Sequence, residues 1–435
     1  MPLREEVQWN VDDVYNMDEH RRFNLLDFKH LEDRDLALAV AALSFNQWFM
    51  KFFCKEHKLA TDVQEQLILL LSRSVSLQEL FLESCGLKPD FPIKMAAALQ
   101  ENPSSILQSI DLSGNVLEDR VRQAFLTPAC LSCVSQMLLS SKLFSATLTH
   151  LDLSGNPGSL VSQDAVFLFR FLSGTNSVSY LDLSDTSCPL DTVFESLSAG
   201  CCEKLKHLDL SRNSFRSRKI CDATCSIQAF FSRSRQLKYV CLSGTRLPPP
   251  ALRSLLQGLA TNTFIFGLEL DLSSCELCSP GAQVIQEHIS EATALQSLNI
   301  SDNGFEDEVV TLILAIGRCR ALRQLSLGRN FVLKSRNLAD ALHRIAQLIQ
   351  DEECPLQSLS LRDSKLKTDV SILLKALGAP AVLTHVDISG NHAGDTGARI
   401  LARALRSNTR LKSLSWDRNN ITVKGYQDLA NALER

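Results

Sequence analysis

The segment LTHLDLSGNPGSL, residues 148–160, places a histidine, an aspartate and a serine at every second position. His150, Asp152 and Ser154 are the side-chain types of a hydrolase triad, in which the serine attacks a carbonyl carbon and the histidine takes its proton. On an extended strand, however, residues two apart are separated by roughly 6.6 Å. A triad needs its nucleophile and base within about 3 Å and an oxyanion hole beside them. A straight strand supplies neither, so we expect no catalysis here.

The surrounding residues explain the trio as part of a repeat. They follow the pattern L-x-x-L-x-L-x-x-N/C-x-L, which is the leucine-rich-repeat signature. Twelve copies start at Leu77, Leu107, Leu148, Val178, Leu205, Leu237, Gly267, Leu295, Leu322, Leu356, Leu383 and Leu411. Most intervals are 27–30 residues, which is typical of the long repeat with a helix in each unit. The trio recurs at His207, Asp209 and Ser211 and at His385, Asp387 and Ser389. Three copies are expected of a repeated surface and not of a catalytic site.

The alternation within each copy predicts which side chains are buried. Positions 4 and 6 are apolar and should point inward, whereas positions 3, 5 and 7 should face out of the sheet. Position 9 carries an amide or a thiol at Cys85, Asn115, Asn156, Asn213, Cys275, Asn303, Asn330, Asn391 and Asn419. We expect these to form a buried ladder bonded to backbone groups. The predicted fold is α/β, a right-handed leucine-rich-repeat solenoid of the ribonuclease-inhibitor-like horseshoe type, with a concave parallel sheet and helices on the convex side.

Two degenerate copies precede the twelve. Phe49, Phe52, Cys54 and Leu59 hold the apolar positions of one, and Phe23, Leu26, Phe28 and Leu31 hold those of an N-terminal cap. We therefore expect a lead-in strap at 1–22, a cap and degenerate repeat at 23–76, and a solenoid at 77–435. The solenoid is irregular at 118–147, because 41 residues separate Leu107 from Leu148 without a second strand pattern. The long 34-residue copy at Leu322 predicts an extra loop or helix extension at 333–337.

Composition excludes several classes of protein. The formal net charge of −4 gives no sign of a nucleic-acid binder. No apolar run reaches the 18 or more residues of a membrane span, and the acidic N-terminus lacks a signal-peptide core. We therefore read the 14 cysteines as reduced thiols in the cytosol. The pairs Cys130/Cys133 and Cys275/Cys278 lie about five repeats apart and cannot share a zinc ion in a solenoid. No metal or other cofactor is expected.

Two candidate contact surfaces remain. Position 5 forms an acidic row in successive repeats, reading Asp111, Asp152, Asp182, Asp209, Cys241 and Asp271. Neighbouring parallel strands sit about 4.8 Å apart, so these carboxylates should lie close together. The row is either a solvated feature of the repeat or a docking strip for a basic segment. The second surface is the C-terminal edge, where Trp416 replaces a leucine and Tyr426 lies on the last helix. A repeat without a polar cap exposes its core, so we expect this edge to fray, self-associate or bind a neighbouring helix.

The cap and inter-repeat residues resemble one known family. The segments FNLLDFKHLEDRDLALAVAALSFNQWF (23–49), LDLSSCEL with GAQVIQ (270–286), LGRNF (327–331), LIQDEECPLQSLSLRDSKLK (348–367) and WDRNNIT (416–422) are similar to the leucine-rich-repeat domain of CARMIL proteins. The resemblance spans roughly 5–435. It implies a cytoplasmic scaffold for the actin-assembly machinery, recruited to the plasma membrane at the leading edge. The family's membrane-binding, dimerisation and capping-protein-binding segments have no counterpart in this sequence. The family also has two ordinary repeats where 118–147 lies.

The function implied is therefore a non-catalytic protein-interaction scaffold in actin-based migration. Two other classes of protein use long leucine-rich repeats. A GTPase-activating protein of the Ran type usually ends in a strongly acidic tail, unlike the NALER sequence here. The sensor domain of an innate immune receptor would follow a nucleotide-binding module, and no glycine-rich phosphate loop is present.

Overall fold

The structure is a computed structural model that describes residues 21–115, 130–140, 142–157, 160, 165–201, 203–216, 220–379 and 382–434. Side chains at 130–132, 143 and 220–222 are outside this description. The chain divides into two compact units, Met1–Thr186 and Ser187–Arg435.

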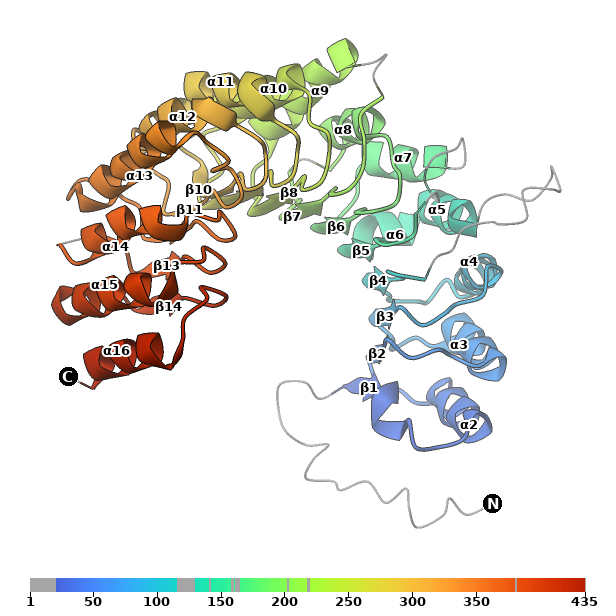
Figure 1. The fold of residues 1–435 in the computed structure, drawn as a ribbon. Helices are drawn as coiled ribbons and strands as arrows, with labels where there is room; N and C mark the ends of the chain where they lie inside the picture. The colour runs from blue at the N-terminus through green and yellow to red at the C-terminus, as the bar shows by residue number, and fades with distance from the viewer. Residues whose placement is uncertain are drawn as a thin grey trace. The chain divides into compact units, whose positions relative to one another are not determined.

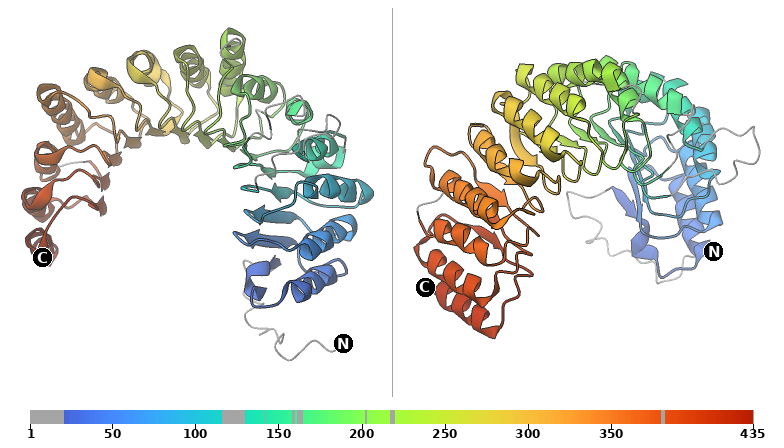
Figure 2. Two further views of the ribbon diagram at one scale, coloured as in Figure 1. Left: turned by 45° about the vertical axis from the view of Figure 1, so that its right-hand side comes forward. Right: turned by 45° about the horizontal axis from the view of Figure 1, so that its top comes forward.

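Unit 1 is a parallel sheet in which every strand pairs with the next strand in sequence (Figure 1). Its strands are β1 (Arg22–Asn24), β2 (Lys51–Lys55), β3 (Glu79–Glu83), β4 (Ser109–Asp111), β5 (His150–Asp152) and β6 (Tyr180–Asp182). Its helices are η2 (Leu25–Phe28), α2 (Asp33–Leu43), α3 (Thr61–Arg73), α4 (Phe91–Glu101), α5 (Cys130–Ser140), α6 (Lys142–Thr147) and α7 (Val166–Ser173). The helices from α2 to α7 lie along one face of the sheet, and the other face is open (Figure 2).

Unit 2 repeats the same arrangement. Its strands are β7 (His207–Asp209), β8 (Tyr239–Cys241), β9 (Leu268–Asp271), β10 (Leu295–Asn299), β11 (Gln324–Ser326), β12 (Ser358–Ser360), β13 (His385–Asp387) and β14 (Ser413–Ser415). Its helices are α8 (Leu190–Ala199), α9 (Ile220–Arg233), α10 (Pro249–Thr261), α11 (Cys278–His288), η4 (Ile289–Glu291), η5 (Glu306–Glu308), α12 (Val309–Ile316), α13 (Ser335–Gln350), η6 (Lys367–Val370), α14 (Ser371–Leu377), α15 (Gly394–Ser407) and α16 (Val423–Leu433). Strands β7 to β14 pair in sequence order and are all parallel.

The leucine-rich-repeat fold is thus confirmed in each unit. The twelve predicted copies correspond to β3 to β14 of the described chain. Leucines at positions 4 and 6, such as Leu151 and Leu153, are buried, while the strand residues between them are more exposed. This burial follows from the two-residue period of a strand, which separates a core face from an open face.

The predicted ladder at position 9 is also present. The Asn156 side-chain nitrogen donates to the main-chain oxygens of Leu112 and Leu153, at 3.0 and 2.9 Å. Leu112 belongs to the preceding repeat, so each amide ties two repeats together. Cys275 takes the same place with its thiol, which lies 3.0 Å from the main-chain oxygen of Leu242 in the preceding repeat. Buried backbone groups that would otherwise lack partners are satisfied in this way.

The N-terminal cap differs from its predicted register. We expected Phe23 to begin the pattern and Leu26 to occupy its second apolar position. Instead Phe23 is opposite Phe52, so it occupies position 4, and the next residues form η2. The Asn24 side chain accepts from the Leu26 main-chain nitrogen at 3.2 Å and starts that 3-10 turn. Of the expected strap at 1–22, the structure describes 21–22 alone, and Arg22 already belongs to β1.

The two long intervals have different structures. In the first, β4 pairs directly with β5, so no strand of a further repeat lies between them. Helices α5 and α6 occupy its C-terminal part, whereas 116–129 lie outside the described residues. In the second, the extra residues lengthen a helix: α13 has 16 residues, compared with 8 in α12 and 7 in α14. The helix-extension alternative at 333–337 is therefore confirmed.

Candidate functional site

The triad-like trio of β5 is not arranged for proton relay. The Ser154 main-chain nitrogen and hydroxyl both donate to one oxygen of Asp152, at 2.9 and 2.7 Å. The His150 ring stacks on Tyr180, with ring centres 3.9 Å apart and planes 10° apart. In a working triad the hydroxyl would donate to the imidazole and the imidazole to the carboxylate. Here the hydroxyl is bonded to the carboxylate.

The bond between aspartate and the serine two residues later recurs and has a structural role. Asp111 accepts from the main-chain nitrogen and hydroxyl of Ser113, and Asp271 accepts in the same way from Ser273. At Asp182, Asp209 and Asp387 the main-chain nitrogen two residues later donates to the carboxylate, at 2.8, 2.8 and 3.0 Å. An aspartate that accepts from its own backbone two residues on forms an Asx turn. The acidic row therefore closes the turn after each strand. We did not anticipate this role, although the D-x-S spacing signals it.

The strand pairing brings the acidic residues of each unit together. In unit 1, Asp111 is opposite Asp152 and Asp152 is opposite Asp182. In unit 2, Asp209, Cys241 and Asp271 are successive neighbours. The predicted row thus consists of three adjacent carboxylates in unit 1 and two carboxylates flanking a thiol in unit 2. Asp111 is 4% exposed and Asp152 is also buried, while the others are half-buried.

Burial perturbs the carboxylates of unit 1. It raises the pKa of Asp111 from 3.8 to about 6; the Asp152 carboxylate adds to the rise, and the bonds from Ser113 oppose it. The pKa of Asp152 is also raised, mainly by burial. The folded chain therefore holds the Asp111 proton at a pH where the unfolded chain has released it. Stability decreases as pH rises through this interval. At neutral pH, a cation bound next to Asp111 and Asp152 would offset the unfavourable free energy of keeping these two buried carboxylates charged.

Aromatic rings stack on the open strand face of each unit. Besides His150 and Tyr180, the pair His207 and Tyr239 stacks with centres 4.5 Å apart. Phe53 and Phe81 of β2 and β3 also stack at 4.5 Å. Burial lowers the pKa of His150, with Asp152 opposing the shift, so this ring is neutral at neutral pH. Side-chain rings held by a neighbouring strand form rigid contact area, which favours binding because little rotamer freedom is lost.

The C-terminal edge is incompletely covered. Trp416 is half-buried, and its indole nitrogen is buried without a hydrogen-bond partner in the described structure. Tyr426 is exposed on α16, and Leu414 of β14 is half-buried where its equivalents in other strands are fully buried. The start of α16 is fixed, since Thr422 donates from its nitrogen and hydroxyl to Asp395, each at 2.7 Å. The predicted edge residues therefore adjoin a well-capped helix.

We propose that this edge opens locally or associates through Trp416 and Tyr426. Hydrogen exchange of 411–433 should be faster than that of the central repeats of unit 2, because terminal elements with few buried apolar contacts open at low free energy. Exchange should slow at high protein concentration if the edge self-associates. Equal protection of 411–433 and of β9 to β11 in a monomeric protein would contradict the proposal.

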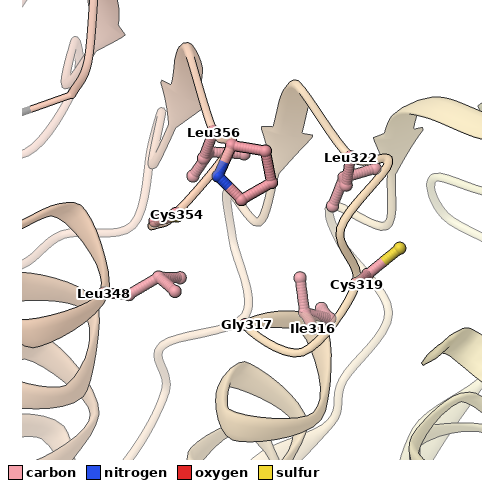
Figure 3. A pocket seen from close by; sticks show the side chains of 8 residues that line it. Ile316, Gly317, Cys319, Leu322, Leu348, Cys354 and Leu356 are labelled. Carbon is pink, nitrogen blue, oxygen red and sulfur yellow. The ribbon is translucent and has the colours of Figure 1, made fainter. Parts of the chain in front are cut away.

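The described residues offer little room for a small ligand. A cavity between α12 and α13 is lined by Ile316, Leu322, Leu348 and Leu356, and Figure 3 shows its apolar lining. Its volume is about 10 Å³, which is at the lower limit for one water molecule. Within the described ranges, no group of three or more His, Cys, Asp or Glu side chains could hold a metal ion, and no helix is long and apolar enough to cross a membrane.

Each repeat contributes one strand and at least one helix to the described structure. Together with the buried Asn/Cys ladder and the open face of polar and aromatic side chains, this defines a leucine-rich-repeat protein of the long-repeat class. The family model described as CARMIL family, LRR domain, matches residues 120–435. The chain belongs to this family.

Individual relatives agree with this assignment. Capping protein, Arp2/3 and myosin-I linker protein 3 of Rattus norvegicus is 45% identical over 451 residues, covering 99% of this chain and 33% of the relative. Capping protein, Arp2/3 and myosin-I linker protein 2 of Mus musculus is 51% identical over 398 residues, covering 91% of this chain and 30% of the relative. Protein CARMIL of Dictyostelium discoideum is 27% identical, covering 100% of this chain and 43% of the relative. The chain spans about a third of the length of the first two relatives.

Proposed function

We propose that this chain is a non-catalytic protein-interaction scaffold in the regulation of actin assembly. The relatives' names connect them with capping protein, Arp2/3 and myosin-I, which supports actin-assembly proteins as the class of partner. We extend this to a cytoplasmic protein that acts at the plasma membrane of the leading edge, in the lamellipodium of migrating cells. Capping-protein binding is assigned to no residue of this chain. The proposed partners are proteins and not nucleic acids.

The observation that carries the scaffold proposal is the open strand face of unit 1. Asp152 and Asp182 lie side by side there, each with one carboxylate oxygen fixed in its turn. The stacked rings of His150 and Tyr180 adjoin them on the same strands. Fixed carboxylates beside a rigid aromatic surface suit a basic, partly apolar segment of another protein or of the same protein's own tail. Binding there would neutralise carboxylates whose repulsion and burial are unfavourable to the free chain.

The direct test is affinity capture of partners from cytosol, scored for actin-assembly proteins against Ran. We expect actin-assembly proteins to be retained. The double variant Asp152→Asn/Asp182→Asn keeps an oxygen that can accept the turn bond but removes both charges. It should bind a basic partner about tenfold less tightly and with a shallower salt dependence, because two charge contacts are lost. Asp340→Asn, which changes an exposed carboxylate on α13, is the matched control and should bind normally.

Two results would contradict the proposal. Unchanged affinity of the double variant for every retained basic partner would exclude the acidic row as the docking surface. A rate of ester or GTP hydrolysis that is measurable in the unmodified chain and disappears in Ser154→Ala would show that the chain is an enzyme.

A further inference from the structure

The loop between α10 and β9 exposes two phenylalanines of unit 2. Phe264 is 52% exposed and Phe266 is 74% exposed, whereas Ile265 between them is 6% exposed. The alternation shows an extended segment anchored by its central residue, with the rings on either side of the anchor pointing outward. Large apolar side chains that adjoin one another on the surface mark interaction sites more often than isolated ones do.

The loop is fixed by one asparagine. The Asn262 side-chain nitrogen donates to the main-chain oxygens of Phe231 and Ser234, at 2.6 and 2.7 Å. Its side-chain oxygen accepts from the main-chain nitrogens of Phe264 and Ile265, at 2.7 and 3.0 Å. Asn262 is itself buried. Asn262 thus makes four hydrogen bonds, two of them to the loop backbone that carries the rings, so little freedom is lost when the rings bind.

Cations cover the faces of both rings. The Arg235 guanidinium lies over Phe264 at 5.0 Å, and the Lys238 ammonium lies over Phe266 at 3.8 Å. Lys238 also donates to the Phe266 main-chain oxygen at 2.8 Å. These are cation–π contacts, in which the ring face attracts the positive charge. One face of each ring is thereby occupied, while 52% of Phe264 and 74% of Phe266 remain exposed.

More basic residues continue this surface along the neighbouring strand. Lys206 precedes β7 and Lys238 precedes β8, and the Lys206 main-chain oxygen accepts from the Lys238 nitrogen at 2.8 Å. Both lysines are exposed. We call Lys206, Arg235, Lys238, Phe264 and Phe266 the basic–aromatic rim. Glu203 lies 3.7 Å from Arg235 as an exposed counter-charge, and Glu269 is exposed on β9, which leaves the rim with a positive excess.

We infer that the basic–aromatic rim docks on a membrane surface that contains anionic phospholipid. The edges of Phe264 and Phe266 would enter the boundary between headgroups and acyl chains, where aromatic side chains are favoured. Lys206, Arg235 and Lys238 would stay at the level of the lipid phosphates, as basic residues do at anionic surfaces. The observations favour a bilayer over a peptide or single-stranded nucleic acid. The rings project from a loop, and one face of each ring is already occupied by a cation, which leaves less ring surface for stacking on a base or on a partner's aromatic ring.

Vesicle co-sedimentation of the whole chain tests this inference. The chain should bind phosphatidylcholine vesicles that contain about one-third phosphatidylserine, and bind pure phosphatidylcholine vesicles weakly. Phe264→Ser/Phe266→Ser should weaken binding by about tenfold or more, because both apolar anchors are lost. Arg235→Gln/Lys238→Gln should weaken it and reduce its salt dependence. Val332→Ser removes an apolar side chain that is 91% exposed after β11 and should bind as the unmodified chain does.

The thermal midpoint of every variant should match that of the unmodified chain, since the altered side chains are exposed. The inference is overturned if the unmodified chain does not bind the anionic vesicles at physiological salt, or if the double phenylalanine variant binds them equally well. It is also overturned if the same variant loses a protein partner while vesicle binding is absent. None of these outcomes depends on the strand face proposed above, which carries none of the altered residues.

Discussion

Replacing Asn303 by alanine is expected to destabilise unit 2 by about 3 kcal/mol or more, because buried groups that lose their partners each cost about 1–3 kcal/mol. The Asn303 side-chain nitrogen donates to three main-chain oxygens, including that of Leu272 in the preceding repeat, at 2.9 to 3.1 Å. Its oxygen accepts from two main-chain nitrogens of the preceding repeat, including that of Cys275 at 2.9 Å. All five groups would lose this partner at once.

The effect should be measured as a change in the denaturation midpoint and as hydrogen exchange of 268–305. Exchange should increase most in that range, because each repeat contacts its neighbours and transmits little further. Asn337→Ala is the matched control, since it removes a half-buried amide whose nitrogen makes one hydrogen bond, to Asp307 at 2.7 Å. It should change stability by less than about 0.5 kcal/mol. Equal midpoints for the two variants would show that the ladder does not stabilise the repeats.

Replacing Phe231 by alanine should cost about 3–5 kcal/mol, the range for deleting a buried aromatic ring. The ring is fully buried and meets Phe230 edge-on, with centres 5.1 Å apart, and Phe194 at 6.0 Å. Helices α9 and α10 approach closely beside it: a Cβ added at Gly258 would lie 2.8 Å from the Phe231 Cβ. Such a contact leaves the backbone little room to collapse into the cavity.

The matched control is Phe264→Ala, which removes the same side chain from the exposed loop. It should leave the denaturation midpoint nearly unchanged, within about 0.5 kcal/mol. Midpoints from chemical denaturation of both variants, followed by far-UV circular dichroism, would check the prediction. A loss as large for Phe264→Ala as for Phe231→Ala would mean that the loop contributes to folding and not only to the surface.

The repeat period predicted the fold because one rule governs every copy. In most repeats the apolar residues at positions 4 and 6 and the residue at position 9 have to be buried, so their places follow from the sequence alone. The N-terminal cap broke the rule. Asn24 begins a 3-10 turn there, and β1 has three residues, so the later apolar residues no longer follow strand spacing. In the N-terminal cap, the hydrogen bond between the Asn24 side chain and the Leu26 main-chain nitrogen therefore determined the local structure more than the apolar pattern did.

The candidate sites were less predictable from sequence. The acidic row and its neighbours were correctly ordered within each unit, because parallel pairing follows from the repeat. The turn bonds from Ser113 and Ser154 were missed, because the aspartates were interpreted by their strand position alone and the D-x-S spacing was not used. Burial of Asp111 depends on the side chains around it, including those of the next strand, and so does its pKa. Phe264 was not singled out from the sequence, because its exposure depends on the bonds that Asn262 makes to the loop backbone.

Within each unit, every strand is bonded to strands adjacent in sequence, and this geometry determines the response to mechanical tension. A force applied along the direction in which the strands are stacked would break the hydrogen bonds of one strand pair after another. Each repeat that detaches would release roughly 28 residues, or about 95 Å of extended chain. Such a unit would lengthen in steps under force and rewind when the force falls.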